Sequence, residues 1–188
     1  MNVLLLSGGI ESTCLAYWKR PHLCLTIDYG QPGAAAELEA SSAITKKLSI
    51  DHEILFASAG RPFKYGEGRT SCASPEFWPY RNQFLATVAL IHLFGKQAQS
   101  LWFGSVRSDA KFADGTREFF NKLSKLSVFQ EGGISIEAPA LRLSTQELIE
   151  KSRTPRSILG ATFSCHRSNT ACGDCPGCRK HRDILYSF

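Results

Sequence analysis

The stretch MNVLLLSGGIESTCLAYW, residues 1–18, is the most informative part of the sequence, because an apolar run leads directly into two glycines and then into a helical pattern. Residues 3–6 predict a strand, and residues 13–20 predict a helix. Gly8 and Gly9 let the backbone approach a ligand closely, and the start of the helix presents unpaired N–H groups and a partial positive charge. The segment therefore predicts a cradle for phosphate groups.

Three hydroxyl groups flank the glycines and add hydrogen-bond donors: Ser7, Ser12 and Thr13. The spacing is neither that of the lysine-containing loop G-x-x-x-x-G-K-[ST] nor that of the dinucleotide motif G-x-G-x-x-G. A glycine-rich turn closed by a serine or threonine cap, without a ligand, is the alternative interpretation.

Strand-like and helix-like segments alternate along the rest of the chain. Further strands are expected at residues 22–30, 52–57, 100–106 and 135–140. Helices are expected at residues 34–50, 82–99 and 114–126, and after a capping box formed by Ser144 and Glu147. This order predicts one α/β domain, residues 1–188, built on a parallel five-stranded sheet with helices on both faces. Ligands of such sheets bind beyond the carboxyl ends of the strands, where the two glycines lie.

The net charge of +5 permits an anionic substrate such as a nucleotide but equally fits a mixed, solvated surface, so no direct nucleic-acid partner is expected. The longest apolar stretch, residues 84–94, falls short of the roughly 20 residues of a membrane span. No signal peptide is recognisable at residues 1–6, so we expect a cytoplasmic protein without a membrane partner. The irregular stretch 58–80 is rich in Gly, Pro, Ser and Arg and is expected to be a functional or mobile loop.

Four of the seven cysteines are clustered in the spacing C-x6-C-x2-C-x2-C, within residues 164–182. Clustered cysteines favour metal binding, and four thiolates without an open position describe a structural zinc site. The expected ligands are Cys165, Cys172, Cys175 and Cys178. Free thiols or two disulfides are the alternative, and His166 and His181 are expected to be surface residues. The scattered Cys14, Cys24 and Cys72 are expected to be small buried hydrophobes.

The segment SGGIEST, residues 7–13, resembles the SGGxDS signature of the PP-loop ATP pyrophosphatases, with Glu11 in place of the aspartate. Four more segments match in order: DYGQ (28–31), RNQFL (81–85), ISIEAPALRLSTQEL (134–148) and SCHRSNTACGDCPGC (164–178). Together they resemble the 7-cyano-7-deazaguanine synthase (QueC) family over residues 3–182. The resemblance implies a Rossmann-like fold of the PP-loop (HUP) type with a C-terminal zinc knuckle.

The resemblance also implies an ATP-dependent ligase that forms C–N bonds. In this family ATP adenylates the carboxylate of 7-carboxy-7-deazaguanine and releases pyrophosphate, and ammonia then displaces AMP to give an amide. A second ATP activates the amide, and loss of AMP leaves the nitrile. The implied cofactors are a structural Zn²⁺ and a Mg²⁺ that accompanies ATP, and the implied assembly is a homodimer.

The positions that match the family motifs imply the site residues. ATP is expected to contact Leu6, Ser7, Gly8, Gly9, Ile10, Glu11, Ser12, Thr13, Asp28, Arg81 and Gly104. Catalytic roles are implied for Glu11, Arg81 and Lys111. The deazaguanine pocket is expected to be formed largely by residues 104–120, with contacts from Phe84, Arg107, Asp109, Asp114 and Arg117. Asp114 is equally a candidate N-cap of the helix that follows it.

Departures from the family pattern lie on the acceptor side. FADGTR (112–117) replaces the family's Y-P-D-C-R segment, and Tyr80 replaces a glycine. Thr145 stands where the family has a lysine, a cation that Lys111 is expected to replace. Three alternatives therefore stay open: transfer of the activated deazaguanine to another amine, including that of an acceptor protein; a tRNA-modifying PP-loop enzyme; and a non-catalytic nucleotide-binding subunit.

Overall fold

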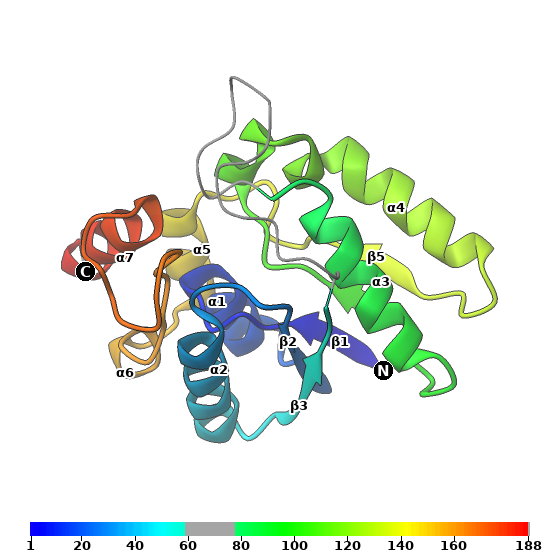
Figure 1. Cartoon of the computed structure of the whole chain (residues 1–188), viewed down its shortest axis with the longest axis horizontal. Helices are drawn as coiled ribbons and strands as arrows, with labels where there is room; N and C mark the ends of the chain where they lie inside the picture. The colour runs from blue at the N-terminus through cyan, green and yellow to red at the C-terminus, as the bar shows by residue number, and fades with distance from the viewer. Residues whose placement is uncertain (59–77, 188) are drawn as a thin grey trace.

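The computed structural model describes residues 1–58 and 78–187, and these residues form a single parallel sheet with helices on both faces (Figure 1). The strand order is β3-β2-β1-β4-β5, and every neighbouring pair is parallel. The strands are β1 (Asn2–Leu5), β2 (Leu23–Asp28), β3 (Asp51–Phe56), β4 (Ser100–Trp102) and β5 (Ser135–Glu137). The predicted α/β class and the five-stranded parallel sheet are confirmed.

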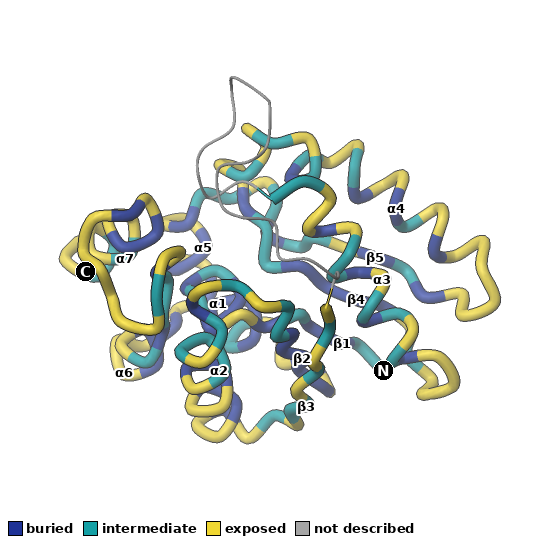
Figure 2. Tube along the Cα trace, viewed as in Figure 1, coloured by how far each residue is buried: buried dark blue, intermediate teal, exposed yellow. Residues whose placement is uncertain are grey.

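Two pairs of helices cover the sheet. On one face lie α1 (Ile10–Lys19) and α2 (Ala34–Leu48), which bury Leu15 and Ile44 against the sheet residue Leu4. On the other face lie α3 (Arg81–Leu93) and α4 (Arg117–Phe129), whose Ala86 and Phe120 pack in the second core cluster. The buried positions in Figure 2 follow the strands and the inward sides of these helices. Among the described residues, no helix has the length and apolar character needed to cross a membrane.

The C-terminal part packs beside α1. It contains α5 (Thr145–Ser152), α6 (Arg156–Leu159) and α7 (Pro176–Tyr186), and α7 lies at the edge of the molecule in Figure 1. The predicted capping box of α5 is present, because Ser144 Oγ accepts from Glu147 N at 3.1 Å and Glu147 Oε2 accepts from Ser144 N at 2.6 Å. The helices α6 and α7 were not expected from the sequence.

Between β4 and α4 the chain forms two 3-10 turns, η1 (Arg107–Lys111) and η2 (Ala113–Gly115). The predicted helix 114–126 therefore begins only at Arg117. Its N-cap is Thr116, whose Oγ1 accepts from Phe119 N at 3.2 Å, so the interpretation of Asp114 as the N-cap is wrong. Of the predicted irregular stretch 58–80, residues 59–77 lie outside the described part of the chain, as does Cys72.

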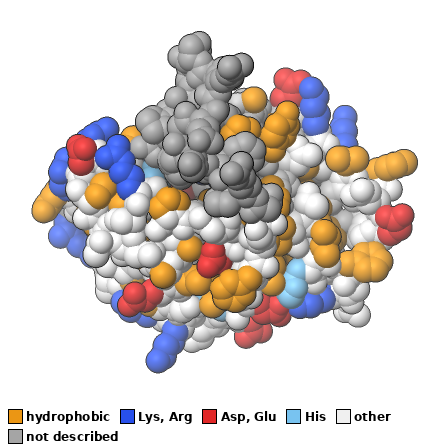
Figure 3. Space-filling view, in the orientation of Figure 1, with side chains coloured by type: hydrophobic (Ala, Val, Ile, Leu, Met, Phe, Trp, Pro, Cys, Tyr) orange, Lys and Arg blue, Asp and Glu red, His pale blue; other side chains and the backbone are white. Residues whose placement is uncertain are grey.

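Hydrophobic side chains are exposed over the C-terminal ends of α3 and α4, a part of the surface visible in Figure 3. These residues are Ile91, Phe94, Leu126, Val128 and Phe129. Phe129 is 88% exposed, far more than a core residue would be. Several large apolar side chains exposed together are typical of an interaction surface.

Candidate functional site

The predicted phosphate loop, residues 7–13 and called the phosphate loop below, leads from β1 into α1. Gly8 has φ +75°, and a Cβ at this position would lie 2.8 Å from Ala40 Cβ, so the turn requires glycine. Gly9 is the N-cap of α1, and no side chain caps it. The positive end of the helix is thus left open to an anion. Leu6 and Ile10 are buried core residues and offer a ligand only their backbone groups.

The hydroxyl groups of the loop are organised around one another. Ser7 Oγ accepts from Gly9 N at 3.3 Å and lies 3.3 Å from Ser12 Oγ, which donates to Gly9 O at 3.2 Å. Thr13 is fully buried, and its Oγ1 has no hydrogen-bond partner within residues 1–58 and 78–187. The loop is therefore preorganised around a polar interior rather than extended into solvent.

The loop lies where the strand order reverses, between β1 and β4, which is the usual ligand crevice of such sheets. Gly104 follows β4, and a Cβ there would lie 2.8 Å from Ser12 Cα, so the end of β4 touches the first turn of α1. Asp28 ends the adjacent β2, and its Oδ1 accepts from Gly30 N at 2.9 Å. The predicted ATP residues of three strands thus share one edge of the sheet.

Glu11, in the first turn of α1, is held by two residues that lie far away in the sequence. Lys180 Nζ of α7 lies 2.5 Å from Glu11 Oε1, and Thr145 Oγ1 donates to the same oxygen at 2.7 Å. Burial raises the pKa of the Glu11 carboxyl, but Lys180 and Thr145 outweigh burial and hold this pKa below its usual value. The carboxylate is therefore ionised and directly paired with a lysine.

A second carboxyl, that of Glu37 in α2, lies near the turn after β2. Gln31 Nε2 donates to Glu37 Oε2 at 2.8 Å. Burial raises the pKa of Glu37 to about 7, although Gln31 and Arg81 lower it. Arg81 is exposed at the start of α3, and its charge lowers the pKa of both Glu37 and Asp109. This arginine is thus within electrostatic range of carboxyl groups on both sides of the crevice.

The raised pKa of Glu37 predicts a pH-dependent stability. The folded state holds the proton more tightly than the unfolded chain, whose carboxyl has the ordinary value of 4.5. The free energy of unfolding should therefore fall as pH rises from about 4.5 to about 7 and then level off. Glu37→Gln removes the titratable carboxyl. We expect the free energy of unfolding to rise by an amount on the order of 1–3 kcal/mol at pH 8, and to depend less on pH, as measured by urea unfolding at several pH values.

The control for this measurement is Glu39→Gln, a substitution at an exposed position of the same helix. It should leave the slope of the free energy of unfolding against pH unchanged. An equal slope in Glu37→Gln and the unmodified protein would contradict the assignment of the titration to Glu37.

The two predicted acceptor-side aspartates lie in the 3-10 turns. Asp109 Oδ2 accepts from Val106 N at 3.0 Å, and burial raises the pKa of this carboxyl despite the lowering effect of that N–H group and of Lys180. The backbone carbonyl of Asp114 accepts from the buried Asn82 Nδ2 at 2.9 Å. Asp109 thus lies within electrostatic range of the Glu11–Lys180 pair, whereas the described contact of Asp114 ties η2 to α3.

The predicted cations of this region have partners of their own. Arg107 Nη2 lies 2.7 Å from Glu147 Oε2 and donates to Arg142 O at 2.6 Å, which fastens η1 to the start of α5. Lys111 is exposed, and its Nζ lies 5.0 Å from the centre of the Phe112 ring. These described contacts lie outside the phosphate loop. A cation that does contact the loop is Lys180, which the sequence analysis did not assign to the site.

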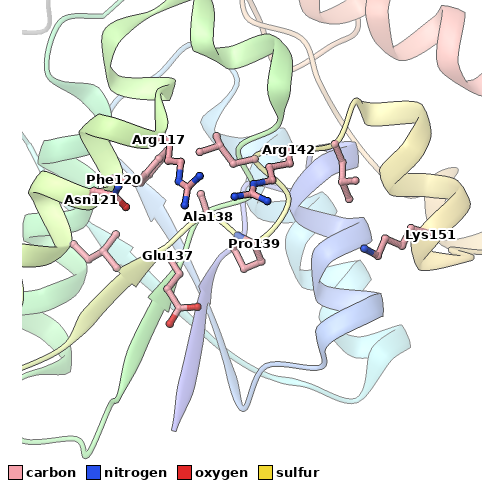
Figure 4. A pocket seen from close by; sticks show the side chains of 11 residues that line it. Arg117, Phe120, Asn121, Glu137, Ala138, Pro139, Arg142 and Lys151 are labelled. Atoms are coloured by element: carbon pink, nitrogen blue, oxygen red, sulfur yellow. The ribbon is translucent and has the colours of Figure 1, made fainter.

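Arg117 lies in a pocket separate from the phosphate loop. It lines a pocket of ≈ 470 Å³ beyond β5, together with Arg142, Glu137 and Pro139 (Figure 4). The guanidinium groups of Arg117 and Arg142 both point into this pocket. None of its described lining residues belongs to the phosphate loop. The predicted substrate residues are therefore divided between the crevice and the β5 pocket.

An aromatic cluster at the crevice was missed by the sequence analysis, except for Phe84. The rings of Tyr29 and Trp78 are stacked, with centroids 4.8 Å apart, and the Trp78 and Phe84 rings are 5.6 Å apart. Tyr29 follows β2, and Phe84 lies in the first turn of α3. Flat aromatic surfaces of this kind suit the stacking of a planar base.

The four predicted metal ligands come together. All four Sγ atoms lie within 4.8 Å of one another, and Cys172 Sγ and Cys178 Sγ are 3.9 Å apart. This distance is close to the roughly 3.8 Å edge of a tetrahedron of sulfurs around zinc, which follows from a Zn–S bond of about 2.3 Å. Backbone N–H groups of Cys178 and His166 point at Cys175 Sγ, at 3.3 and 3.4 Å.

The chemistry of the cluster also fits a cation. Desolvation opposes ionisation of Cys165, but backbone N–H groups outweigh it and lower its pKa. Burial and the neighbouring sulfurs raise the pKa of Cys178 instead, because adjacent thiolates repel one another. The cluster is compatible with a structural metal such as zinc. Cys14 and Cys24 are buried in the core, as predicted.

Of the two histidines that were expected to be surface residues, one is exposed and the other is not. His166 is exposed, as predicted, but His181 is half-buried, with Nε2 at 2.9 Å from Thr162 Oγ1. Neither belongs to the described metal-binding group.

The sequence matches the family model described as "Queuosine biosynthesis protein QueC" over residues 1–187. The chain belongs to the QueC family. A relative named "7-cyano-7-deazaguanine synthase" from Desulforudis audaxviator is 28% identical over 205 residues, covering 95% of this chain and 93% of the relative. Another, "7-cyano-7-deazaguanine synthase 2" from Rhodopseudomonas palustris, is 29% identical over 197 residues, with 95% and 93% covered. The suspected membership is confirmed, and these synthase names support an enzyme.

Proposed function

We propose that this QueC-family chain is an ATP-dependent ligase that adenylates the carboxylate of 7-carboxy-7-deazaguanine. A carboxylate oxygen attacks the α-phosphate, the bond to the β-phosphate breaks, and pyrophosphate leaves. An amine nitrogen then attacks the acyl carbon, loses a proton and displaces AMP. With ammonia the product is the amide, and a second ATP takes the amide to the nitrile.

The observation that carries this proposal is the open helix end at Gly9, at the switch point of a chain that matches the QueC family from residue 1 to residue 187. The loop geometry supports binding of the leaving pyrophosphate. The names of the relatives support a deazaguanine-type substrate and ATP. The electrostatic effect of Arg81 on carboxyl groups on both sides of the crevice supports a contact between this residue and a phosphate. The aromatic cluster of Tyr29, Trp78 and Phe84 supports binding of a flat ring.

The cofactors and the assembly belong to the same proposal. Zn²⁺ held by the four cysteines would have a structural role, and Mg²⁺ would enter with ATP and reduce the charge of its phosphates. Glu11 offers the carboxylate oxygens that Mg²⁺ prefers, although Lys180 now neutralises it. The exposed apolar residues at the ends of α3 and α4 support a homodimer. The enzyme would work in the cytoplasm.

Transfer of the activated deazaguanine to another amine, including an amine of an acceptor protein, is the second candidate. It is favoured by the remodelled segment 112–117, which contains η2 and the first residue of α4. Adenylation needs aligned phosphates and one bound carboxylate, whereas nitrile formation also needs the amide to be retained and activated again. A PP-loop tRNA-modifying enzyme is the third candidate, and a gel shift with tRNA would identify it.

The test is mass spectrometry of the products after incubation with ATP, Mg²⁺, 7-carboxy-7-deazaguanine and ammonia. We expect AMP and pyrophosphate to form readily and the amide to exceed the nitrile. Loss of one well-placed cation costs about 2–4 kcal/mol of transition-state stabilisation, enough to slow a step by about 30- to 900-fold. A reaction without the deazaguanine is the control.

Two outcomes would contradict this proposal in different ways. Rapid and complete conversion to the nitrile would mean that the departures from the family pattern are neutral. No AMP above the control would mean that the substrate is wrong or that the chain is a non-catalytic nucleotide-binding subunit.

A further inference from the structure

We propose that Lys180 is a second phosphate-binding cation of this site, beside Arg81, and that the helix of the cysteine cluster supplies it to the phosphate loop. This inference rests on the proposed ATP site and assigns to it a residue from α7. Nothing in the loop itself provides a lysine or arginine, because residues 7–13 are Ser, Gly, Gly, Ile, Glu, Ser and Thr. A helix end and a carboxylate alone would bind a polyphosphate poorly, since Glu11 repels it.

The geometry places the ammonium group at the start of α1. Lys180 Nζ lies 2.5 Å from Glu11 Oε1, and Glu11 is the second residue of that helix. The lysine side chain is 42% exposed, so its ammonium group is accessible to a ligand, whereas the Glu11 side chain is 20% exposed. The charge of Lys180 also lowers the pKa of Asp109, which lies beyond β4. The ammonium group therefore lies near carboxyl groups of two elements that border the crevice, the first turn of α1 and the 3-10 turn after β4.

Three anchors fix α7 in this position. Cys175 is the N-cap of α7 and its Sγ accepts from Cys178 N, so two of the four cysteines lie at the start of the helix. One residue after Lys180, His181 Nε2 lies 2.9 Å from Thr162 Oγ1. Near the end of α7, Ile184 packs against the apolar cluster shared by α1 and α5. Because α7 is held at three points, its backbone does not have to be ordered when Lys180 binds a ligand.

Lys180 differs from the other basic residues of α7 in what it contacts. Arg179 Nη1 lies 3.2 Å from Asp174 Oδ1, within the cysteine segment, and Arg182 Nε lies 3.7 Å from Asp183 Oδ1 on the same helix. Basic side chains over α7 are visible at the left of Figure 3. Only Lys180, among the described ion pairs of this helix, connects to the phosphate loop.

The test is the affinity for inorganic pyrophosphate and for Mg·ATP, measured by calorimetry on the full chain. We expect Lys180→Ala to weaken both by about 10- to 100-fold, the effect of losing one charge-assisted contact. Lys180→Arg should retain most of the affinity. In the Lys180→Ala background, Thr145→Lys should restore part of it, because Thr145 contacts the same Glu11 oxygen. The matched control is Arg182→Ala, which should bind like the unmodified protein.

Zinc content and melting temperature are measured for every variant, so that weaker binding caused by unfolding is distinguished from the loss of a contact with the ligand. Unchanged affinity in Lys180→Ala, or loss in Lys111→Ala in its place, would overturn the assignment of Lys180 while leaving the proposed function intact. An unmodified protein that binds neither ligand would overturn the assignment and the proposed ATP site together. An unmodified protein that binds pyrophosphate but forms no AMP would overturn only the proposed reaction.

Discussion

Cys175→Ser is expected to abolish metal binding and to leave the chain unstable or insoluble. Cys175 is fully buried and is the N-cap of α7. Its Sγ accepts hydrogen bonds from the backbone N–H groups of Cys178 and His166. A structural zinc contributes about 10–16 kcal/mol in small metal-binding domains, comparable to the whole stability of a typical domain of about 5–15 kcal/mol. The purified unmodified protein should hold about one zinc per chain, measured by elemental analysis, with a melting temperature that falls on chelation.

The expected loss is large because the cysteine segment also supports the phosphate loop. Phe163 N donates to Gly8 O at 2.9 Å. A Cβ at Gly33 would lie 2.9 Å from Cys165 O, so the segment touches the start of α2 without a gap. Loosening of the cluster should therefore also release residues that surround the phosphate loop.

The matched control is Asp174→Asn, at an exposed position between two of the cysteines. It should retain the zinc and nearly the full melting temperature. Protein that is free of metal and melts at the same temperature as zinc-loaded protein would contradict the structural role. Retention of one zinc by Cys175→Ser would contradict the ligand assignment.

The sequence predicted the parts of this fold in which one local pattern dominates. Alternating apolar strands and amphipathic helices predicted the sheet, and the glycine pair predicted the loop after β1. The spacing of the cysteines predicted their convergence, because ligands of one ion must lie within a few ångströms of one another. Each of these signals is contained in a short stretch of residues.

The parts that were missed depend on contacts between distant segments. Lys180 reads as one of several solvated charges after the last cysteine, and only the docking of α7 against α1 brings it to Glu11. Trp78 joins Tyr29 only because α3 begins above the end of β2. The two 3-10 turns before α4 have no periodic pattern, so the helix start was placed too early, at Asp114 instead of Arg117.

Gly9→Val is expected to abolish ATP binding while the fold survives. Gly9 has φ −75° and ψ 166°, an extended conformation that valine adopts readily. A Cβ at this position would meet Ser7 Oγ at 3.4 Å and Phe163 O at 3.8 Å, which are ordinary contacts. The cost to the fold should be about 1 kcal/mol for a poor helix N-cap, visible as a small drop in melting temperature.

The effect on binding should be far larger than the effect on stability. The two methyl groups of valine would stand at the open N-terminal end of α1, where the phosphate groups must approach the backbone. We expect the affinity for Mg·ATP and for pyrophosphate to fall by about 100-fold or more, the equivalent of about 3 kcal/mol. Calorimetry with both ligands measures this loss, and circular dichroism and zinc content confirm the fold.

Two further variants separate steric exclusion from damage to the loop. Gly8→Ala places a Cβ 2.8 Å from Ala40 Cβ at φ +75°. Unlike Gly9→Val, it should lower the melting temperature strongly, and it shows how a variant that damages the loop behaves. Gly132→Val lies in the loop between α4 and β5, where a Cβ meets only side chains at 3.8 Å, and should change neither property. Full ATP affinity in a folded Gly9→Val would mean that the phosphates bind elsewhere, because the branched side chain would stand at the N-terminal end of α1, where the proposed site places them.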